Sequence, residues 1–164
     1  MDLSQFSTDD LLLAALKSEQ DSKHIYEGLA HAVKNAFLKD RLLFLAAEEE
    51  KHQAYFERIY ADRFPRKSIV LPAENVVPLP EIKANGSLVP ISDILLSAMN
   101  AEDAAYRFYQ GLANRFEGDE GTRSMVFYIA SMEKGHYRFL EVERENALER
   151  ENFDVSWPLV HVGP

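Results

Sequence analysis

The sequence predicts an all-α protein, a four-helix bundle in which one long crossover joins the second and third helices. Three observations predict it: four long stretches with helical periodicity, a proline-rich segment in the middle of the chain, and an internal repeat that relates the two halves. The chain has 164 residues, of which 46% are apolar. This length and composition suit a single domain with a substantial hydrophobic core.

Each of the four helices has recognisable ends. The segment Ser7–Asp10 supplies an N-cap and first-turn acids for the first helix. The second helix ends before Pro65 and the third begins just after Pro90, because proline breaks a helix interior. Gly118 and Gly121 fall in the turn between the last two helices. The predicted helices span about residues 8–34, 36–63, 92–116 and 120–150, and a C-terminal tail follows at 151–164.

The crossover at residues 64–91 differs in composition from the rest of the chain. Its five prolines exclude a helix there. A helix of roughly 27 residues is about 40 Å long, and about a dozen extended residues cover that distance. The crossover can therefore run the length of the bundle, so we expect an up-down-down-up arrangement with helices two and three parallel. The alternative is a linker between two domains, but a lone two-helix hairpin buries too little apolar surface.

The two predicted hairpins resemble each other in sequence. Residues 26–30 (YEGLA) match residues 109–113 (YQGLA), and a glutamate lies seven residues before each tyrosine. In the second helix of each hairpin, residues 44–52 match residues 128–136. The separation is 83 residues in the first helices and 84 in the second, so one insertion or deletion in a turn explains the difference. A duplicated hairpin packed on itself brings matching residues face to face across a pseudo-two-fold axis.

A Glu-x-x-His motif occurs once in each half, and this spacing places a carboxylate and an imidazole on one face of a helix. The other helix of each hairpin offers one more glutamate. Four carboxylates and two imidazoles from four helices form the ligand pattern of di-iron and di-manganese carboxylate bundles. The candidate metal ligands are Glu19, Glu49, His52, Glu102, Glu133 and His136.

The chemistry of this set favours a pair of divalent ions. Four carboxylates cancel four positive charges and can bridge two ions, and oxygen donors with some imidazole suit iron or manganese. Zinc more often uses fewer ligands. One Glu-x-x-His motif alone is a weak indication, since most such pairs on helices are solvated. Here both motifs adjoin apolar residues, where an uncompensated carboxylate is costly. We therefore predict two iron ions, with manganese as the alternative, and we expect Glu48 and Glu50 to point away from them.

Other features exclude several classes of function. The formal net charge of −9 disfavours nucleic acid and anionic membranes as partners. The chain has no cysteine, which excludes disulfides, thiolate ligands and Fe–S clusters. No apolar run approaches the length of a transmembrane helix, and the N-terminus lacks the pattern of a secretory signal. We therefore expect a cytoplasmic protein.

With these motifs in place, the sequence resembles the rubrerythrin-like branch of the ferritin-like superfamily over about residues 10–150. The resemblance implies a ferritin-like bundle in which each ligand has its own role: bridging for Glu49 and Glu133, terminal for Glu19 and Glu102, and capping for His52 and His136. It also implies that Tyr26 and Tyr109 donate hydrogen bonds to carboxylate ligands. The plainer reading makes these two tyrosines core aromatics with a satisfied hydroxyl.

Two departures from the family's pattern bear on activity. Full-length rubrerythrins carry a cysteine-rich rubredoxin domain, so this chain would need an external electron-donor protein. Rubrerythrins also have an additional glutamate three residues after the third-helix ligand, linked to their peroxide reactivity, where this chain has Ala105. With Ser22 at the matching place in the first helix, the symmetric site is similar to the ferroxidase centre of bacterioferritin.

The preferred function is a di-iron oxidoreductase in which reduced iron reacts with peroxide or dioxygen, and the resemblance implies a homodimer. Three alternatives remain open. The chain could oxidise iron for storage in a multi-subunit shell, it could bind or handle iron without turnover, or it could be a metal-free structural bundle.

Overall fold

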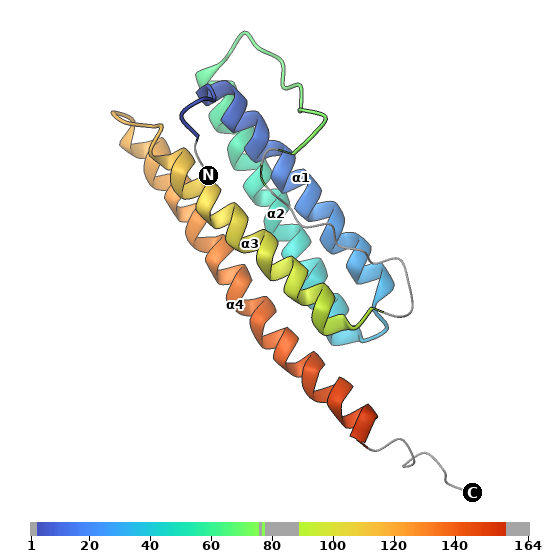
Figure 1. The fold of residues 1–164 in the computed structure, drawn as a ribbon. Helices are drawn as coiled ribbons and strands as arrows, with labels where there is room; N and C mark the ends of the chain where they lie inside the picture. The colour runs from blue at the N-terminus through green and yellow to red at the C-terminus, as the bar shows by residue number, and fades with distance from the viewer. Residues whose placement is uncertain (1–2, 76, 78–88, 157–164) are drawn as a thin grey trace, which may run out of the picture.

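The structure, a computed structural model, describes residues 3–75, 77 and 89–156, the last three of these by their helical backbone only. Its helices are α1 (Thr8–Ala32), α2 (Ala36–Arg63), α3 (Ile91–Ala113) and α4 (Glu120–Ser156). Figure 1 shows α1 and α4 running in one direction and α2 and α3 in the other, which is the predicted up-down-down-up arrangement. None of the described helices is long and apolar enough to cross a membrane.

The bundle consists of two antiparallel hairpins laid against each other. In one hairpin α1 packs along α2, and in the other α3 packs along α4; between the hairpins α1 contacts α3 and α2 contacts α4. We call the line along which α2 and α4 meet the α2–α4 seam. Two contacts set its register: Arg41 Nε lies 2.9 Å from Glu143 Oε1, and the ring centroids of Phe44 and Phe139 are 6.0 Å apart.

Side-chain caps fix the starts of the first two helices. The Ser7 hydroxyl accepts from the Asp10 N–H at 3.1 Å, and the Asp10 carboxylate accepts from the Ser7 N–H at 3.0 Å. The Asn35 side chain accepts from the Leu38 N–H at 3.0 Å and begins α2 only three residues after α1 ends. Such caps satisfy N–H groups that have no partner within the helix.

Two predicted helix ends were too late. α1 ends at Ala32 rather than residue 34, because Val33 is already extended (φ −80°, ψ 139°). α3 ends at Ala113 rather than residue 116. There the Arg115 N–H donates to the Leu112 carbonyl at 2.9 Å and the Phe116 N–H donates to the Ala113 carbonyl at 3.1 Å. These tighter bonds turn the chain, while Phe116 remains fully buried.

The largest difference lies at the end of α4, which continues to Ser156, so residues 151–156 of the predicted tail are helical. Figure 1 shows this end of α4 extending past the other helices. The added turn holds the start of α3, where Pro90 offers no side-chain cap. Instead Glu151 accepts from the Ser92 N–H at 3.1 Å and from its hydroxyl at 2.6 Å. The rest of the predicted tail, and crossover residues 76 and 78–88, lie outside the described residues.

Two clusters of buried side chains fill the bundle, one toward each end. One cluster includes Leu12 and Leu16 of α1 and Phe108 of α3, and the other includes Leu29 of α1 and Leu42 of α2. The stretch of α1 between them carries Glu19. The core is thus divided at mid-height by a polar layer, and the candidate ligands lie there.

Candidate metal centre

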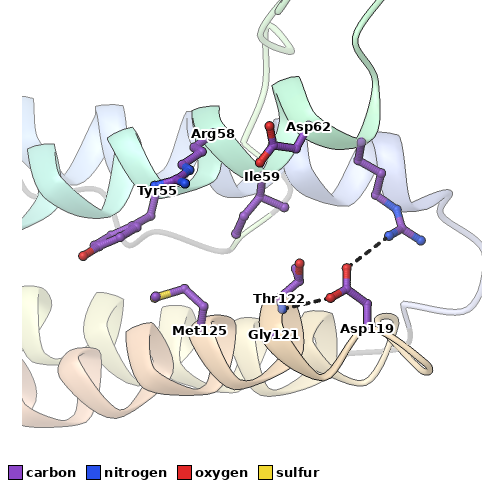
Figure 2. Close-up of a pocket in the computed structure, with 9 residues that line it drawn as sticks. Tyr55, Arg58, Ile59, Asp62, Asp119, Gly121, Thr122 and Met125 are labelled. Carbon is purple, nitrogen blue, oxygen red and sulfur yellow. Dashed lines mark hydrogen bonds and ion pairs between the residues drawn. The ribbon is translucent and has the colours of Figure 1, made fainter.

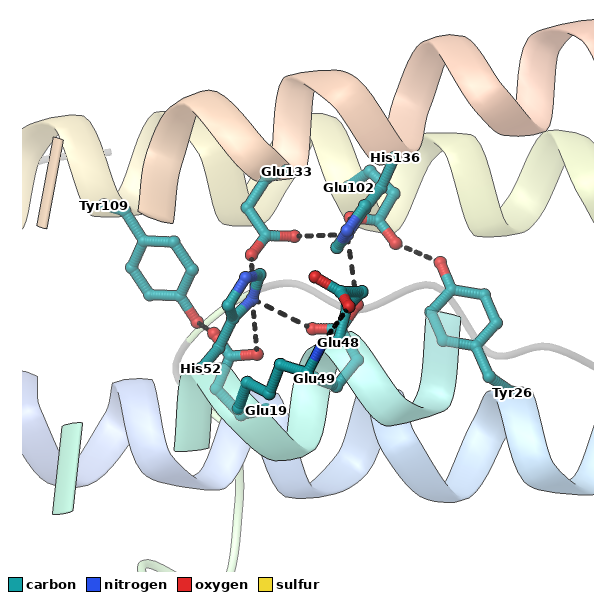
Figure 3. A network of polar contacts seen from close by, with 10 residues as sticks. Glu19, Tyr26, Glu48, Glu49, His52, Glu102, Tyr109, Glu133 and His136 are labelled. Atoms are coloured by element: carbon teal, nitrogen blue, oxygen red, sulfur yellow. Dashed lines mark hydrogen bonds and ion pairs between the residues drawn. The ribbon is translucent and has the colours of Figure 1, made fainter. Parts of the chain in front are cut away.

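The structure brings all six predicted ligands into one buried cluster at the middle of the bundle (Figure 3). α1 and α3 contribute one glutamate each, and α2 and α4 each contribute a Glu-x-x-His pair. The exposed fraction of these residues ranges from 0% for His52 to 6% for His136. Burial of four carboxylates is very costly unless positive charge compensates them.

The ligands fall into two overlapping groups, and within each group the ligand atoms lie within 4.8 Å of one another. Glu49 and Glu133 belong to both groups. The two groups are therefore Glu19, Glu49, His52 and Glu133, and Glu49, Glu102, Glu133 and His136. Two ions at these positions would be neighbours that share two carboxylates, which is the arrangement that a bridging role requires.

Both imidazoles turn the same nitrogen, Nδ1, toward the carboxylates. His52 Nδ1 lies 2.8 Å from Glu133 Oε1 and 3.6 Å from Glu19 Oε2. His136 Nδ1 lies 3.3 Å from Glu49 Oε1 and 3.6 Å from Glu102 Oε2. The two rings are nearly parallel, with centroids 5.5 Å apart and an angle of 18° between their planes. Neither hairpin alone could build this layer, because each imidazole approaches carboxylates of the other hairpin.

The hydrogen bonds within the cluster leave several of its buried polar atoms without a partner, and metal ions could bind those atoms. Five of its buried atoms have no hydrogen-bond partner of acceptable geometry: Oε1 of Glu49 and Glu133, Nδ1 of His52 and His136, and Nε2 of His52. His52 Nδ1 and Glu133 Oε1 are close, as are His136 Nδ1 and Glu49 Oε1, but the angles at these atoms do not suit a hydrogen bond. Buried polar atoms without partners are rare and costly. Two oxygens and two nitrogens converging on one space have the donor chemistry of a site for divalent cations such as iron or manganese.

Without an ion, protons would balance the charge of this layer. Burial, with repulsion from Glu133 and Glu49, raises the pKa of Glu19 and Glu102 well above the ordinary value. Burial lowers the pKa of His136, but the neighbouring carboxylates, Glu102 first, outweigh it and raise this pKa to about 12. Metal ligation requires deprotonated groups. Protons and cations therefore compete for the same atoms.

Two buried tyrosines connect the hairpins through the ligands. The Tyr26 hydroxyl on α1 donates to Glu102 on α3, and the Tyr109 hydroxyl on α3 donates to Glu19 on α1. Burial and the adjacent carboxylates raise the pKa of both phenols well above the ordinary value, so both remain donors. The two readings of these residues describe the same contacts, because each ring is part of the core and each hydroxyl holds a candidate ligand.

The family now follows from the comparison with known proteins. A family model described as rubrerythrin matches residues 10–143. The chain belongs to the rubrerythrin family. Among solved structures it is similar to hypothetical protein Pfu-1136390-001 from Pyrococcus furiosus, with 34% sequence identity and a TM-score of 0.81. That match covers 90% of this chain and 94% of the other. No curated protein matches.

In this member of the rubrerythrin family, the two positions singled out as departures supply no carboxylate to the centre. Ala105 is buried, 5% exposed, among the core residues of α3. Ser22 is partly buried on α1. The two ligand groups therefore have the same composition, three glutamates and one histidine each.

Glu48 is more buried than Glu50: 12% of its side chain is exposed, against 65% for Glu50. We expected both to point away from the ions, and neither belongs to a ligand group. Glu48 pairs with Lys51, one turn along α2. Figure 3 shows Glu48 beside Glu49, on the side of the site nearer to His136. The sequence alone could not predict how deeply Glu48 is buried, because its burial depends on how the two hairpins pack.

A surface pocket of about 410 Å³ lies between α2 and α4 near the start of α4 (Figure 2). Arg63 and Asp119 face each other across it at 3.8 Å, and the Thr122 N–H donates to Asp119 at 3.1 Å. Its lining contains none of the six candidate ligands. This pocket is therefore separate from the metal centre.

Proposed function

We propose that this rubrerythrin-family protein binds two iron ions at the buried cluster and is an oxidoreductase that reduces a small oxidant, peroxide or dioxygen. One observation carries the proposal: buried oxygens and nitrogens from all four helices converge in two groups that share two carboxylates, and those from α2 and α4 include atoms with no hydrogen-bond partner. Iron bound there would supply one-electron redox chemistry. Manganese suits the same donors and is the alternative ion.

The protein's own residues would hold charge and geometry fixed. Four glutamates supply four negative charges, which match two divalent cations. Glu49 and Glu133 reach both groups, so their carboxylates can adjust to two ions at once. Tyr26 and Tyr109 hold Glu102 and Glu19 by hydrogen bonds from the opposite hairpin. Hydrogen bonds of this kind orient ligands and typically change metal affinity by about 10- to 100-fold when they are removed.

The surroundings of the cluster favour a small oxidant over a large substrate. The ligands are almost fully buried between two hydrophobic clusters. Four surface pockets, including the one between α2 and α4, are lined by residues other than these six. A dioxygen or peroxide molecule needs little room, whereas a bulky organic substrate needs a cavity of several hundred cubic ångströms.

Electrons would come from outside the chain. It has no cysteine and hence no thiolate-bound redox centre of its own. We therefore propose a separate electron-donor protein as a partner. A homodimer and a cytoplasmic location remain predictions from the resemblance and from the sequence.

A second function, ferroxidase activity for iron handling or storage, is favoured by Ala105. The buried methyl group stands where the resemblance placed an additional glutamate linked to peroxide reactivity. A ferroxidase would consume dioxygen in proportion to added Fe(II) and would not need a protein reductant. Sizing would then show a large assembly if the oxidised iron is stored in a shell.

The test begins with anaerobic purification, Fe(II) loading and elemental analysis, with the double variant His52→Ala/His136→Ala as control. We expect about two iron ions per chain in the wild type, as the ligand set of such bundles implies, and almost none in the control. Peroxide and dioxygen are then added separately, with and without a reductant, and their consumption is followed. Iron that stays bound while neither oxidant is consumed would contradict the oxidoreductase and leave a binding protein. Absence of bound metal would leave a metal-free bundle.

A further inference from the structure

The two halves of the metal centre have the same ligands but different outer neighbours. In the internal repeat, Lys51 of α2 corresponds to Gly135 of α4, and each directly precedes a histidine ligand. Glu48 corresponds to Met132 in the same alignment. One imidazole therefore follows a long side chain, whereas the other follows a residue with no side chain.

The exposure of the two imidazoles follows this difference. His52 is 0% exposed and His136 is 6% exposed. A Cβ atom placed on Gly135 would meet nothing within 4 Å, so the space beside it is open. Gly135 itself is exposed, and it directly precedes His136 in α4. Solvent thus approaches the histidine of one ligand group and not that of the other.

The register of the α2–α4 seam places Glu48 at this uncovered stretch. Arg41 contacts Glu143 and Phe44 packs on Phe139, so each step toward the C-terminus of α2 is a step toward the N-terminus of α4. One turn beyond Phe44, Glu48 comes opposite Gly135. Its side chain is 12% exposed, and its carboxylate is paired with the ammonium of Lys51, whose side chain is 62% exposed. Glu48 is therefore a carboxylate with partial solvent contact beside the more accessible ligand group.

We propose that the ion in the His136 group exchanges with solvent through the stretch of the seam between Gly135 and Glu48, with Glu48 as a transient ligand, while the ion in the His52 group stays trapped. The inference rests on the proposed metal binding but not on any reaction with an oxidant.

The physical reason is that an ion leaves a buried site stepwise, and each lost ligand needs a replacement. Oxygen ligands bind divalent cations readily and exchange at low cost when they are partly hydrated. Glu48 can supply such an oxygen after it releases Lys51, because the Lys51 side chain is 62% exposed and water can solvate its ammonium instead. On the other side, His52 is 0% exposed, and Met132, which corresponds to Glu48 in the repeat, offers no oxygen. The His52 group lacks both the opening and the intermediate ligand.

The experiment measures metal release without turnover. Protein loaded anaerobically with Co(II) is mixed with excess EDTA, and the absorption of bound Co(II) is followed. The wild type should lose its two ions in two phases of equal amplitude. Glu102→Gln removes a ligand that belongs only to the His136 group, so this variant should keep the slow phase alone. Glu19→Gln, its counterpart in the other group, should keep the fast phase alone.

Two variants, each with a matched control, then test whether the ion of the His136 group leaves between Gly135 and Glu48. Gly135→Lys gives α4 the residue that α2 has, and it should slow the fast phase by about tenfold, as a neighbour of the ligands can. Gly28→Lys makes the same change at an exposed helical glycine of α1 with equally open surroundings, and it should leave both phases unchanged. Glu48→Gln should slow both uptake and loss of the fast ion by about tenfold. Glu50→Gln removes the same charge at a 65% exposed position and should not.

The possible failures are distinct. Two ions released at one common rate, or a fast phase that Gly135→Lys and Glu48→Gln leave unchanged, would overturn this inference while two bound ions keep the proposed function intact. Absence of bound Co(II) would overturn both. Because circular dichroism and metal content are measured on each variant, a change in rate is separated from a failure to fold.

Discussion

The hairpin α1–α2 and the hairpin α3–α4 contribute the same ligand types at repeated positions, yet they differ one layer outside the ligands. Glu49 and His52 match Glu133 and His136 in identity and in their approach to the carboxylates of the other hairpin. One residue away, Lys51 has become Gly135. Within the ligand layer, each imidazole lies close to glutamates of both hairpins. The outer layer faces solvent and is free to differ.

Pseudo-symmetry of the ligands therefore does not make two bound ions equivalent. The composition of the two ligand groups is identical, so the electrostatic environment of two ions would be similar. Their access to solvent differs, because access depends on side chains outside the groups. Experiments that break the symmetry at the ligands, at the tyrosines and at the outer layer should therefore give effects of decreasing size.

The largest effect, a loss of bound iron, should follow from replacing either of the two glutamates that both ligand groups share. Glu49→Gln or Glu133→Gln removes a carboxylate that belongs to both ligand groups. We expect bound iron to fall from about two ions per chain, the number for such bundles, to almost none in either variant. Elemental analysis after anaerobic loading and gel filtration measures this. Retention of one firmly held ion in Glu49→Gln would show that the carboxylate serves only one group.

A change in pH should act on both halves in the same direction. In the metal-free protein the pKa of both histidines is raised, that of His136 to about 12, and the pKa of Glu19 and Glu102 is raised as well. Groups with a raised pKa in the folded state favour folding below their unfolded pKa, near 6.5 for histidine, and this contribution is lost as pH rises toward the folded value.

The metal-free protein should therefore lose stability between about pH 6.5 and pH 10, and the metal-loaded protein should not, because its ions have replaced the protons. Binding of Fe(II) at pH 7 should release at least about one proton per ion, which a pH indicator in weak buffer detects. Thermal melting of both forms across this range is the second measurement. A metal-free protein whose Tm rises steadily over this range would contradict the assignment.

The tyrosines provide a test of smaller size. Tyr26→Phe removes the hydrogen bond to Glu102, and Tyr109→Phe removes the one to Glu19. We expect each variant to lower the binding affinity for one ion by about 10- to 100-fold and to leave the affinity for the other unchanged. Competition with a chelator of known affinity measures the two binding steps. Equal weakening of both ions by one variant would mean that the tyrosine acts through the packing of the bundle rather than through its carboxylate.

The smallest effect should come from the exposed glycines. Gly135→Ala and Gly28→Ala place a methyl group in open space on a helix, so each should raise the free energy of unfolding by about 0.5–1 kcal/mol. Gly111→Ala serves as the control, because the added Cβ would lie 2.7 Å from Leu3 Cδ1. Its free energy of unfolding should rise by less than in the other two variants, or not at all. Urea denaturation of the metal-free proteins measures all three. A loss of stability in Gly135→Ala would show that the space beside His136 is occupied.

The sequence by itself predicted the four helices, their order and the ligand set. Helical periodicity, prolines and caps are local signals, and the ends of α2 at Ala36 and Arg63 agree with them. The ligands were recognisable for a different reason. A carboxylate and an imidazole three residues apart share a helix face in any packing, and the repeat reveals which glutamates are their counterparts.

Tertiary structure decided what depends on contacts between distant residues. α4 continues to Ser156 because Glu151 finds Ser92 at the start of α3, a contact between residues 59 positions apart. The partner of each tyrosine is the glutamate of the other hairpin, which the pairing of α1 with α3 determines. The burial of Glu48 follows from the register of α2 against α4. Local sequence encodes which face of a helix is polar, but only packing determines what that face meets.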